Sequence, residues 1–141
     1  MAKLRHVAIS ASDLEGAASF YKQAFEMQEV GRVDNEIAKG IFLSDGTVNL
    51  AILQPHTDQL GRGTDYRGLH HLGFVVEDLD EAGKKLEELG AACFVQKPDQ
   101  DTQSFFEVKH RGPDGVVLDI SDRPWPGSAG LDDGPASRAE P

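Results

Sequence analysis

The stretch HVAISASDL at residues 6–14 returns as HLGFVVEDL at residues 71–79, and this repeat decides the fold. Each copy opens with a histidine and closes with an Asp–Leu pair at the same spacing. Side chains that alternate between two faces predict a strand in the first part of each copy, and the aspartate that follows is a favourable helix N-cap. The chain is therefore expected to contain one strand–helix unit twice.

Three short strands are expected after each helix. Helical spacing of apolar residues predicts helices that follow Asp13 and Asp78. Apolar runs bounded by turn sequences then predict strands at 29–34, 37–44 and 48–54 in the first unit and at 92–97, 104–110 and 116–121 in the second. The expected fold class is α+β, with two tandem βαβββ modules.

The two modules are expected to form a single domain. This domain spans residues 1–122. It consists of module one at 3–55, a polar, glycine-rich linker at 56–68 and module two at 69–122. The remaining residues 123–141 are rich in Pro, Gly and Ala, so a flexible C-terminal tail is expected there. Trp125 is the exception and is a candidate to dock on the body or on a partner chain.

The composition excludes several classes of protein. A net charge of -10 argues against a nucleic-acid partner, because few cations are available to displace phosphate counterions. No apolar run approaches the roughly 20 residues that a membrane helix needs, so no membrane partner is expected. The single cysteine gives neither a disulfide framework nor a thiolate zinc site. Because the first residues show no secretory signal pattern, the expected localisation is cytoplasmic.

Three polar side chains are expected on one face of the sheet. His6 and His71 lie on the strand faces opposite the most apolar residues. In the last strand, VVLDIS, Asp119 occupies the corresponding face. An aspartate in an apolar strand is costly to bury unless it is paired or bound to a cation. Two imidazoles and a carboxylate on one inner surface therefore predict a metal site.

The segments HVAISASDL, FYKQAF, GLHHLGFVVEDL and PDGVVLDI together resemble the vicinal oxygen chelate superfamily, and the resemblance covers residues 4–122. This superfamily contains glyoxalase I, methylmalonyl-CoA epimerase, extradiol dioxygenases and bleomycin resistance proteins. The resemblance implies that the modules curve into one open, cup-like mixed sheet with a divalent metal in the cup. Its metal positions fall on His6, His71 and Asp119, with aspartate in place of the usual glutamate. His70 is expected to face the helix side or the linker.

The fourth metal position of the superfamily lacks an obvious ligand in this chain. The resemblance places that position on Ala51, which has no donor atom. Asn49 lies on the same strand face and is kept as the possible fourth ligand, whereas Gln54 lies on the other face. Two histidines and one carboxylate with open positions suit Fe(II), Mn(II), Zn(II), Ni(II) or Co(II).

The resemblance implies an enzyme whose small-molecule substrate chelates the metal through adjacent oxygens, in a homodimer. The first hypothesis is a lyase or epimerase similar to glyoxalase I (lactoylglutathione lyase), which needs a general base. Glu107 lies on the inner face of its strand and is the candidate base, with Lys109 beside it, although the two could equally form a solvated surface pair. The alternatives are an Fe(II) extradiol dioxygenase and a metal-free binding protein of the bleomycin resistance type.

The remaining polar and aromatic residues carry other expectations. His110 lies on the strand face away from the cup and is expected to be an exposed edge histidine; the alternative is a supporting residue behind the ligands, or the further histidine that a dioxygenase uses. Arg62 and Arg67 of the linker could clamp an anionic substrate or could be solvated loop charges. Three aromatic residues at helical spacing are expected in the core, namely Phe20, Tyr21 and Phe25.

Overall fold

The computed structural model describes residues 1–95 and 107–132. Within these residues, eight strands form one sheet with the order β2-β3-β4-β1-β5-β8-β7-β6. The strands are β1 (Lys3–Ser10), β2 (Gln28–Asp34), β3 (Ala38–Ser44), β4 (Asn49–Pro55), β5 (Gly68–Val75), β6 (Cys93–Val95), β7 (Val108–Arg111) and β8 (Val117–Ser121). The helices are α1 (Leu14–Phe25) and α2 (Leu79–Glu88), with a short 3-10 helix at Pro113–Gly115.

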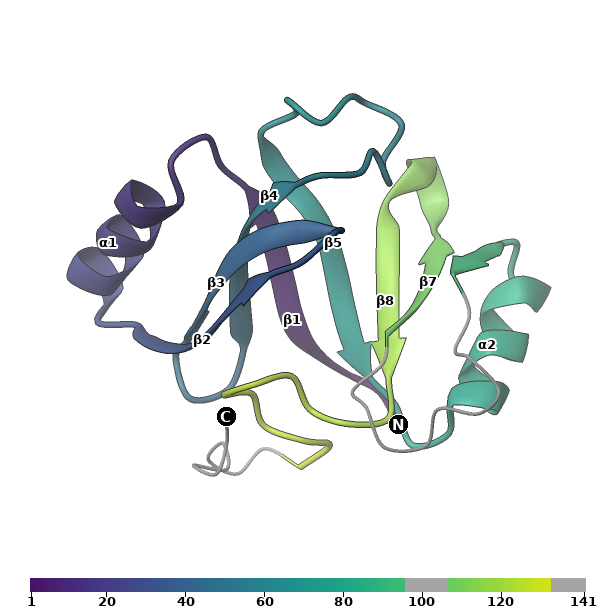
Figure 1. Ribbon diagram of the computed structural model, residues 1–141. Helices are drawn as coiled ribbons and strands as arrows, with labels where there is room; N and C mark the ends of the chain where they lie inside the picture. The colour runs from purple at the N-terminus through teal and green to yellow at the C-terminus, as the bar shows by residue number, and fades with distance from the viewer. Residues whose placement is uncertain (96–106, 133–141) are drawn as a thin grey trace.

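The chain order β1-α1-β2-β3-β4 is repeated as β5-α2-β6-β7-β8. Figure 1 shows the sheet curved and open, with the two helices outside it on opposite sides of the molecule. The predicted α+β fold with two βαβββ modules is therefore confirmed. Strand limits in module one agree with the predicted ones within one residue. Parts of the strands predicted at 92–97 and 104–110 lie outside the described residues.

The register of the central strands brings the candidate site residues into one row. β1 is antiparallel to β5, and each of these strands pairs in parallel with the last strand of its own module. His6 is opposite Asn49 on one side and Gly73 on the other, and Gly73 is opposite Asp119. Residues opposite each other in a sheet project from the same face. The row therefore carries Asn49, His6 and Asp119, with a glycine between the last two.

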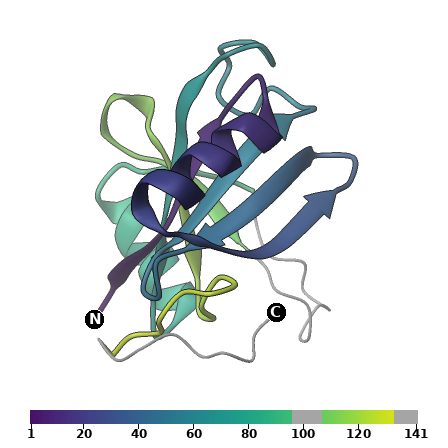
Figure 2. The same ribbon diagram turned by 90° about the vertical axis from the view of Figure 1, so that its left-hand side faces the viewer.

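Both helices begin at the aspartates that the sequence indicated. Asp13 accepts a hydrogen bond from the backbone N–H of Gly16, and Asp78 accepts one from Glu81, each at 3.0 Å. Helix α1 covers the outer face of the module-one strands (Figure 2). The buried core beneath it consists of Leu14, Ala18, Ile41, Leu43 and Ile52. Neither helix in the described residues is long and apolar enough to span a membrane.

Phe20 and Phe25 do not lie in the core, contrary to expectation. Their side chains are 59% and 65% exposed, whereas Tyr21 packs against the core. The buried stripe of α1 passes through Leu14, Ala18 and Tyr21, at positions i, i+4 and i+7. The two phenylalanines lie beside this stripe, so helical spacing alone does not bury them.

Residues 123–132 form a packed segment, here called the C-terminal strap, and the expectation of a flexible tail was wrong for them. Trp125 is only 3% exposed, and its ring stacks on His6 with centroids 4.7 Å apart and an interplanar angle of 3°. A Cβ atom at Gly73 would lie 2.8 Å from Trp125 Cζ2, so the glycine makes room for the indole. The buried indole anchors this Pro- and Gly-rich segment to the sheet. Residues 133–141 lie outside the described residues.

Hydrogen bonds from module one hold the strap. The Arg5 guanidinium donates to the carbonyl oxygens of Gly130 and Asp132, at 3.0 Å each. Asn49 Nδ2 donates to the carbonyl oxygen of Pro126 at 2.8 Å. Two further bonds join Ser44 to Gly127 and Ala129 to Thr47. Figure 1 shows the strap running from the end of β8 toward the lower end of the module-one strands, so it ties the two modules together.

Replacing Trp125 by alanine is expected to destabilise the protein by about 3–5 kcal/mol, because the change empties a buried site beside His6. Trp125→Phe should recover part of this loss. Urea titration gives the free energy of unfolding for each variant. Phe20→Ala is the matched control, since an exposed side chain should contribute no more than about 0.5 kcal/mol. Equally small effects of the two alanine variants would contradict the packing of the strap.

Candidate metal centre

Four potential metal-binding side chains converge on the inner face of the sheet. One donor atom from each of His6, His71, Glu107 and Asp119 lies within 4.8 Å of the others. His6 Nε2 is 3.0 Å from His71 Nε2, which is 3.1 Å from Asp119 Oδ2. Glu107 Oε2 is 3.9 Å from His6 Nε2. The structure thus brings together the three predicted ligands and the predicted base.

His6 is held in a single orientation by Asn49. His6 Nδ1 lies 2.7 Å from Asn49 Oδ1, and Asn49 Nδ2 donates to the carbonyl oxygen of Pro126. Because a carbonyl oxygen only accepts, the amide nitrogen must face Pro126 and the amide oxygen must face His6. His6 Nδ1 therefore carries the ring proton, and Nε2 presents a lone pair to the cluster. Burial, and after it the neighbouring His71, lowers the pKa of His6 from 6.5 to about 3.

A β-bulge determines where His70 lies. The pairing of β1 with β5 passes from Ala8–His71 to Ile9–Leu69 and skips His70. His70 was expected to face the helix side or the linker, but its Nδ1 lies 2.8 Å from His71 Nδ1 and it lines the same cavity as His71. The expectation failed because strict alternation of side chains does not hold across a bulge.

Asp119 is paired with Lys109. The Lys109 ammonium donates to the two carboxylate oxygens of Asp119 at 2.8 and 2.9 Å, and Asp119 is completely buried. A buried carboxylate requires such a partner. The positive charge of Lys109 also lowers the pKa of His70 and His71, after the larger effect of burial. The imidazoles of the site are therefore neutral near pH 7, which is the form that binds metals.

Glu107 has the environment of a general base. Burial raises its pKa above the usual 4.5, and hydrogen bonding to and repulsion from Asp119 raise it further. Its side chain is 30% exposed to solvent, so a small molecule can reach it. A carboxyl group whose pKa is shifted toward neutrality can take up and return a proton efficiently. The alternative of a solvated Glu107–Lys109 pair is not observed, because Lys109 bonds to Asp119.

The donor set suits a divalent metal ion. His6 Nε2 carries a lone pair and faces His71 Nε2 at 3.0 Å, a separation that requires a proton or a cation between the two nitrogens. Imidazole nitrogens combined with carboxylate oxygens are ligands for Zn(II), Fe(II), Mn(II), Co(II) and Ni(II). The chemistry of the residues therefore fits the ion that the sequence predicted.

Asn49 lies behind His6 and not among the donors. Its amide oxygen and nitrogen are both engaged, with His6 Nδ1 and the Pro126 carbonyl. In this position Asn49 orients the imidazole, as carbonyl oxygens commonly do for metal-binding histidines. Ala51, on which the resemblance placed the fourth position, lines the cavity without offering a donor atom.

A cavity of about 360 Å³ lies over the cluster. Its polar side includes the cluster histidines, Glu107 and Lys109. The apolar lining includes Val33, Ile37, Phe42 and Leu53 of module one and Val95 of β6. A mixed lining of this kind suits a small molecule that has both polar and apolar parts. The linker residues Arg62 and Arg67 do not line the described cavity.

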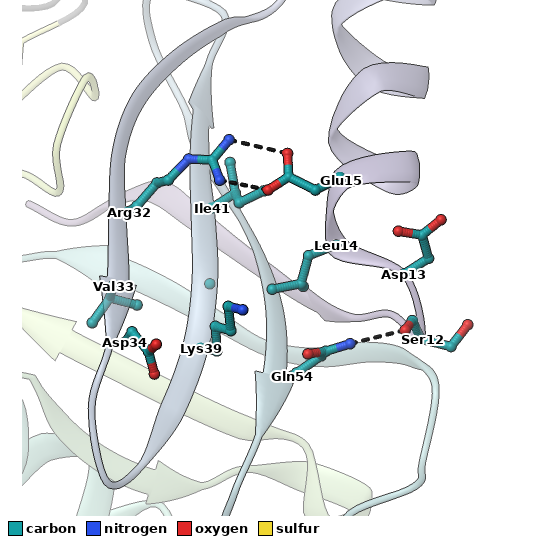
Figure 3. A pocket seen from close by; sticks show the side chains of 11 residues that line it. Ser12, Asp13, Leu14, Glu15, Arg32, Val33, Asp34, Lys39, Ile41 and Gln54 are labelled. Carbon is teal, nitrogen blue, oxygen red and sulfur yellow. Dashed lines mark hydrogen bonds and ion pairs between the residues drawn. The ribbon is translucent and has the colours of Figure 1, made fainter.

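A larger cavity, of about 610 Å³, lies between α1 and strands β2 to β4 (Figure 3). Arg32 reaches across it to the Glu15 carboxylate, with Nη2 3.1 Å from Oε1. Gln54 Nε2 donates to the carbonyl oxygen of Ser12 at 2.8 Å. Within the described part of the chain, no cluster of metal donors lines this cavity. We therefore place the candidate site in the smaller cavity.

His110 is buried, so the expectation of an exposed edge histidine was wrong. It is 1% exposed, and its Nδ1 donates to the carbonyl oxygen of Ala91 at 2.8 Å. Its Nε2 lies near Gly83 of α2, which covers this side of β7. His110 therefore lies on the helix side of the sheet, as its strand position predicted, and is separated from the cluster.

Comparisons with known proteins reveal several relatives. The family model described as the Glyoxalase/Bleomycin resistance protein/Dioxygenase superfamily matches residues 3–120. The ethylmalonyl-CoA/methylmalonyl-CoA epimerase of Cereibacter sphaeroides is 34% identical over 101 residues, which cover 63% of this chain and 72% of that protein. The uncharacterized protein YaeR of Escherichia coli K12 is 30% identical over 122 residues, which cover 84% and 94%. The solved methylmalonyl-CoA epimerase of Mycobacterium tuberculosis shares the fold, with a TM-score of 0.67, 21% identity and coverage of 87% and 88%.

Acid is expected to destabilise the metal-free protein. The pKa of His6 is about 3 when folded and 6.5 when unfolded, so between these values the unfolded state binds more protons. Stability therefore falls as the pH falls below 6.5, by up to about 1.4 kcal/mol per pH unit from this group. His71 contributes with the same sign, whereas the raised pKa of Glu107 acts in the opposite direction.

Urea midpoints measured with EDTA between pH 7 and pH 5 test this expectation. The His6→Gln variant should show a smaller dependence on pH than the unmodified protein, because glutamine does not titrate. His56→Gln is the control, since His56 is exposed. Identical pH dependence in the His6→Gln variant and the unmodified protein would contradict the burial of a neutral imidazole.

Proposed function

This chain belongs to the glyoxalase/bleomycin resistance protein/dioxygenase superfamily, and we propose that it is a metal-dependent enzyme of the epimerase type. In such a reaction a proton is removed from a carbon beside a carbonyl group and is then returned. The observation that carries the proposal is the convergence of two neutral imidazoles and two carboxylates, of which His6, His71 and Glu107 line one cavity. One of these carboxylates, Glu107, has the raised pKa expected of a general base.

His6, His71 and Asp119 are the proposed metal ligands. His6 offers Nε2, His71 offers Nε2, and Asp119 offers Oδ2, while Oδ1 keeps its hydrogen bond to Lys109. The bound ion would act as a Lewis acid toward the oxygen atoms of the substrate and so lower the cost of negative charge there. The donor set is compatible with Fe(II), Mn(II), Zn(II), Ni(II) and Co(II).

Glu107 is the proposed general base. Burial and the nearby Asp119 carboxylate favour its protonated form, so accepting a proton from carbon is easier than for a solvated glutamate. Lys109, fixed by Asp119, adds a positive charge at the same wall of the cavity. That charge stabilises an enolate oxygen or a carboxylate group of a substrate in the cavity.

The proposed substrate class is a small acyl compound with an acidic C–H group and adjacent carbonyl oxygens. The relative from Cereibacter sphaeroides is named for ethylmalonyl-CoA and methylmalonyl-CoA. In both compounds a C–H group lies between a thioester carbonyl and a carboxylate. The apolar residues that line the cavity are suited to the short alkyl branch of such a compound.

An extradiol dioxygenase with Fe(II) is the second candidate. Two histidines and one carboxylate with open positions are the donor set used by many non-haem iron oxygenases, and this observation favours it. A metal-free binding protein is less well supported, because the buried donors His6, His71 and Asp119 would then have no chemical use. We also propose a homodimer, supported by the exposed aromatic side chains Phe20 and Phe25 on α1.

Metal binding should quench the fluorescence of Trp125, the single tryptophan, because its ring stacks on the proposed ligand His6. Titration of the EDTA-treated protein with Co(II) should give a saturable signal at one ion per chain. His71→Ala and Asp119→Asn should weaken binding at least about 10-fold, whereas Asp119→Glu should retain it. His56→Ala is the control. Equal binding by the protein and its Asp119→Asn and Asp119→Glu variants would remove Asp119 from the site.

The metal-loaded protein should exchange the acidic proton of methylmalonyl-CoA or ethylmalonyl-CoA for deuterium in D₂O, as measured by proton NMR. Glu107→Gln should slow this exchange by about 10²–10⁴-fold, because the base is lost. The Co(II) titration of this variant should stay within a few-fold of the unmodified protein. Consumption of O₂ with catechols and no proton exchange would instead support the dioxygenase.

A further inference from the structure

We infer that His70 is a positioning residue that sets the tautomer of His71, and that the two rings exchange proton positions when a metal binds. The inference rests on the proposed function, because it concerns His71 as a metal ligand. It adds a residue to the site that no ligand pattern identifies, since His70 contributes no donor atom to the four-residue cluster.

The bulge in β5 creates this contact. Consecutive residues of a regular strand point to opposite faces, so His70 and His71 could not meet without it. The register skips His70 between Leu69 and His71. The two rings are therefore steeply inclined, with centroids 5.0 Å apart, an interplanar angle of 74° and the Nδ1 atoms 2.8 Å apart. Both side chains are buried, at 7% and 5% exposure.

A contact of 2.8 Å between two nitrogens of neutral imidazoles contains one proton. This proton can belong to either ring. If His70 Nδ1 carries it, His71 Nδ1 accepts, and the proton of His71 is on Nε2. If His71 Nδ1 carries it, His70 Nδ1 accepts, and His71 Nε2 presents a lone pair.

The first arrangement suits the metal-free protein. His71 Nε2–H then donates toward His6 Nε2 at 3.0 Å or Asp119 Oδ2 at 3.1 Å. His6 can only accept, because Asn49 keeps the proton of His6 on Nδ1. Each hydrogen bond in the row thus has one donor and one acceptor, which satisfies the buried polar groups.

The second arrangement is the one that a metal requires. His71 must offer the lone pair of Nε2, so its proton moves to Nδ1 and is donated to His70 Nδ1. His70 then carries its own proton on Nε2, and both rings remain neutral. The described residues give His70 Nε2 no hydrogen-bond partner, and His70 lines the cavity. Binding of the ion at His71 is in this way coupled to a new N–H donor on His70.

The two histidine ligands therefore differ in kind. His6 is preset for metal binding by an amide whose orientation is fixed by the strap, through Asn49 and Pro126. His71 contacts the His70 ring, whose Nδ1 can act as donor or as acceptor. The hydrogen bond between the two rings can therefore form both with and without the ion. The bulge in β5 could adjust the strand twist with any residue at position 70. A role in strand twist therefore does not explain why a buried imidazole contacts His71 there.

Two-dimensional ¹H–¹⁵N long-range NMR of histidine rings, recorded without metal and with Zn(II) alone, tests the inference. We expect the His70 proton on Nδ1 without metal and on Nε2 with Zn(II), while the His6 proton stays on Nδ1 in both states. An unchanged His70 tautomer despite Zn(II) binding at His6 and His71 would overturn the inference and leave the proposed metal site intact. Absence of Zn(II) binding would overturn both.

Variants of His70 provide the second test. His70→Phe keeps a ring but offers no acceptor, so the Zn(II) dissociation constant should rise by about 10–100-fold. His70→Gln can accept from His71 Nδ1 through its amide oxygen and should restore most of the affinity. His56→Phe controls for the loss of an imidazole elsewhere. Affinity equal to that of the unmodified protein in the folded His70→Phe variant would refute the role of His70.

Discussion

The pairing of β1 with β5 is the constraint on which the rest of the structure depends. These are the opening strands of the two modules, and their antiparallel register sets His6 opposite Gly73. Each strand is flanked in parallel by the closing strand of its own module, so the middle of the sheet is made from both modules. The cluster of donors and the cavity above it exist only because this pairing joins the two halves of the chain.

The electrostatics of the site follow from what surrounds each group. Burial keeps the imidazoles neutral, which preserves their lone pairs, while Lys109 offsets the charge of Asp119. Glu107 has no cation bonded to it in the described residues, and its pKa is raised. Two carboxylates a few ångströms apart thus take different roles: Asp119 is suited to hold a cation, and Glu107 is suited to exchange a proton.

Sequence periodicity predicted the strands, both helix caps and the common face of His6, His71 and Asp119, because these features depend on local alternation and spacing. It could not predict the position of His70, since a bulge breaks the alternation and leaves no mark in composition. The docking of Trp125 was anticipated, but the other strap residues were not, because one tryptophan in a Pro- and Gly-rich segment gives no periodic signal. The ion pair of Lys109 with Asp119 depends on side-chain reach across strands, which spacing along one strand does not encode.

The strap makes the two ends of the chain interdependent. His6 is synthesised before Trp125, which stacks on it and is among the last of the described residues. All four residues of the cluster are therefore synthesised before the residue that covers His6 exists. A proteolytic cut between β8 and the strap would spare every donor and yet remove both the indole and the carbonyl of Pro126 that orients Asn49. Integrity of the C-terminal segment is thus a condition for an ordered site at the N-terminal strand.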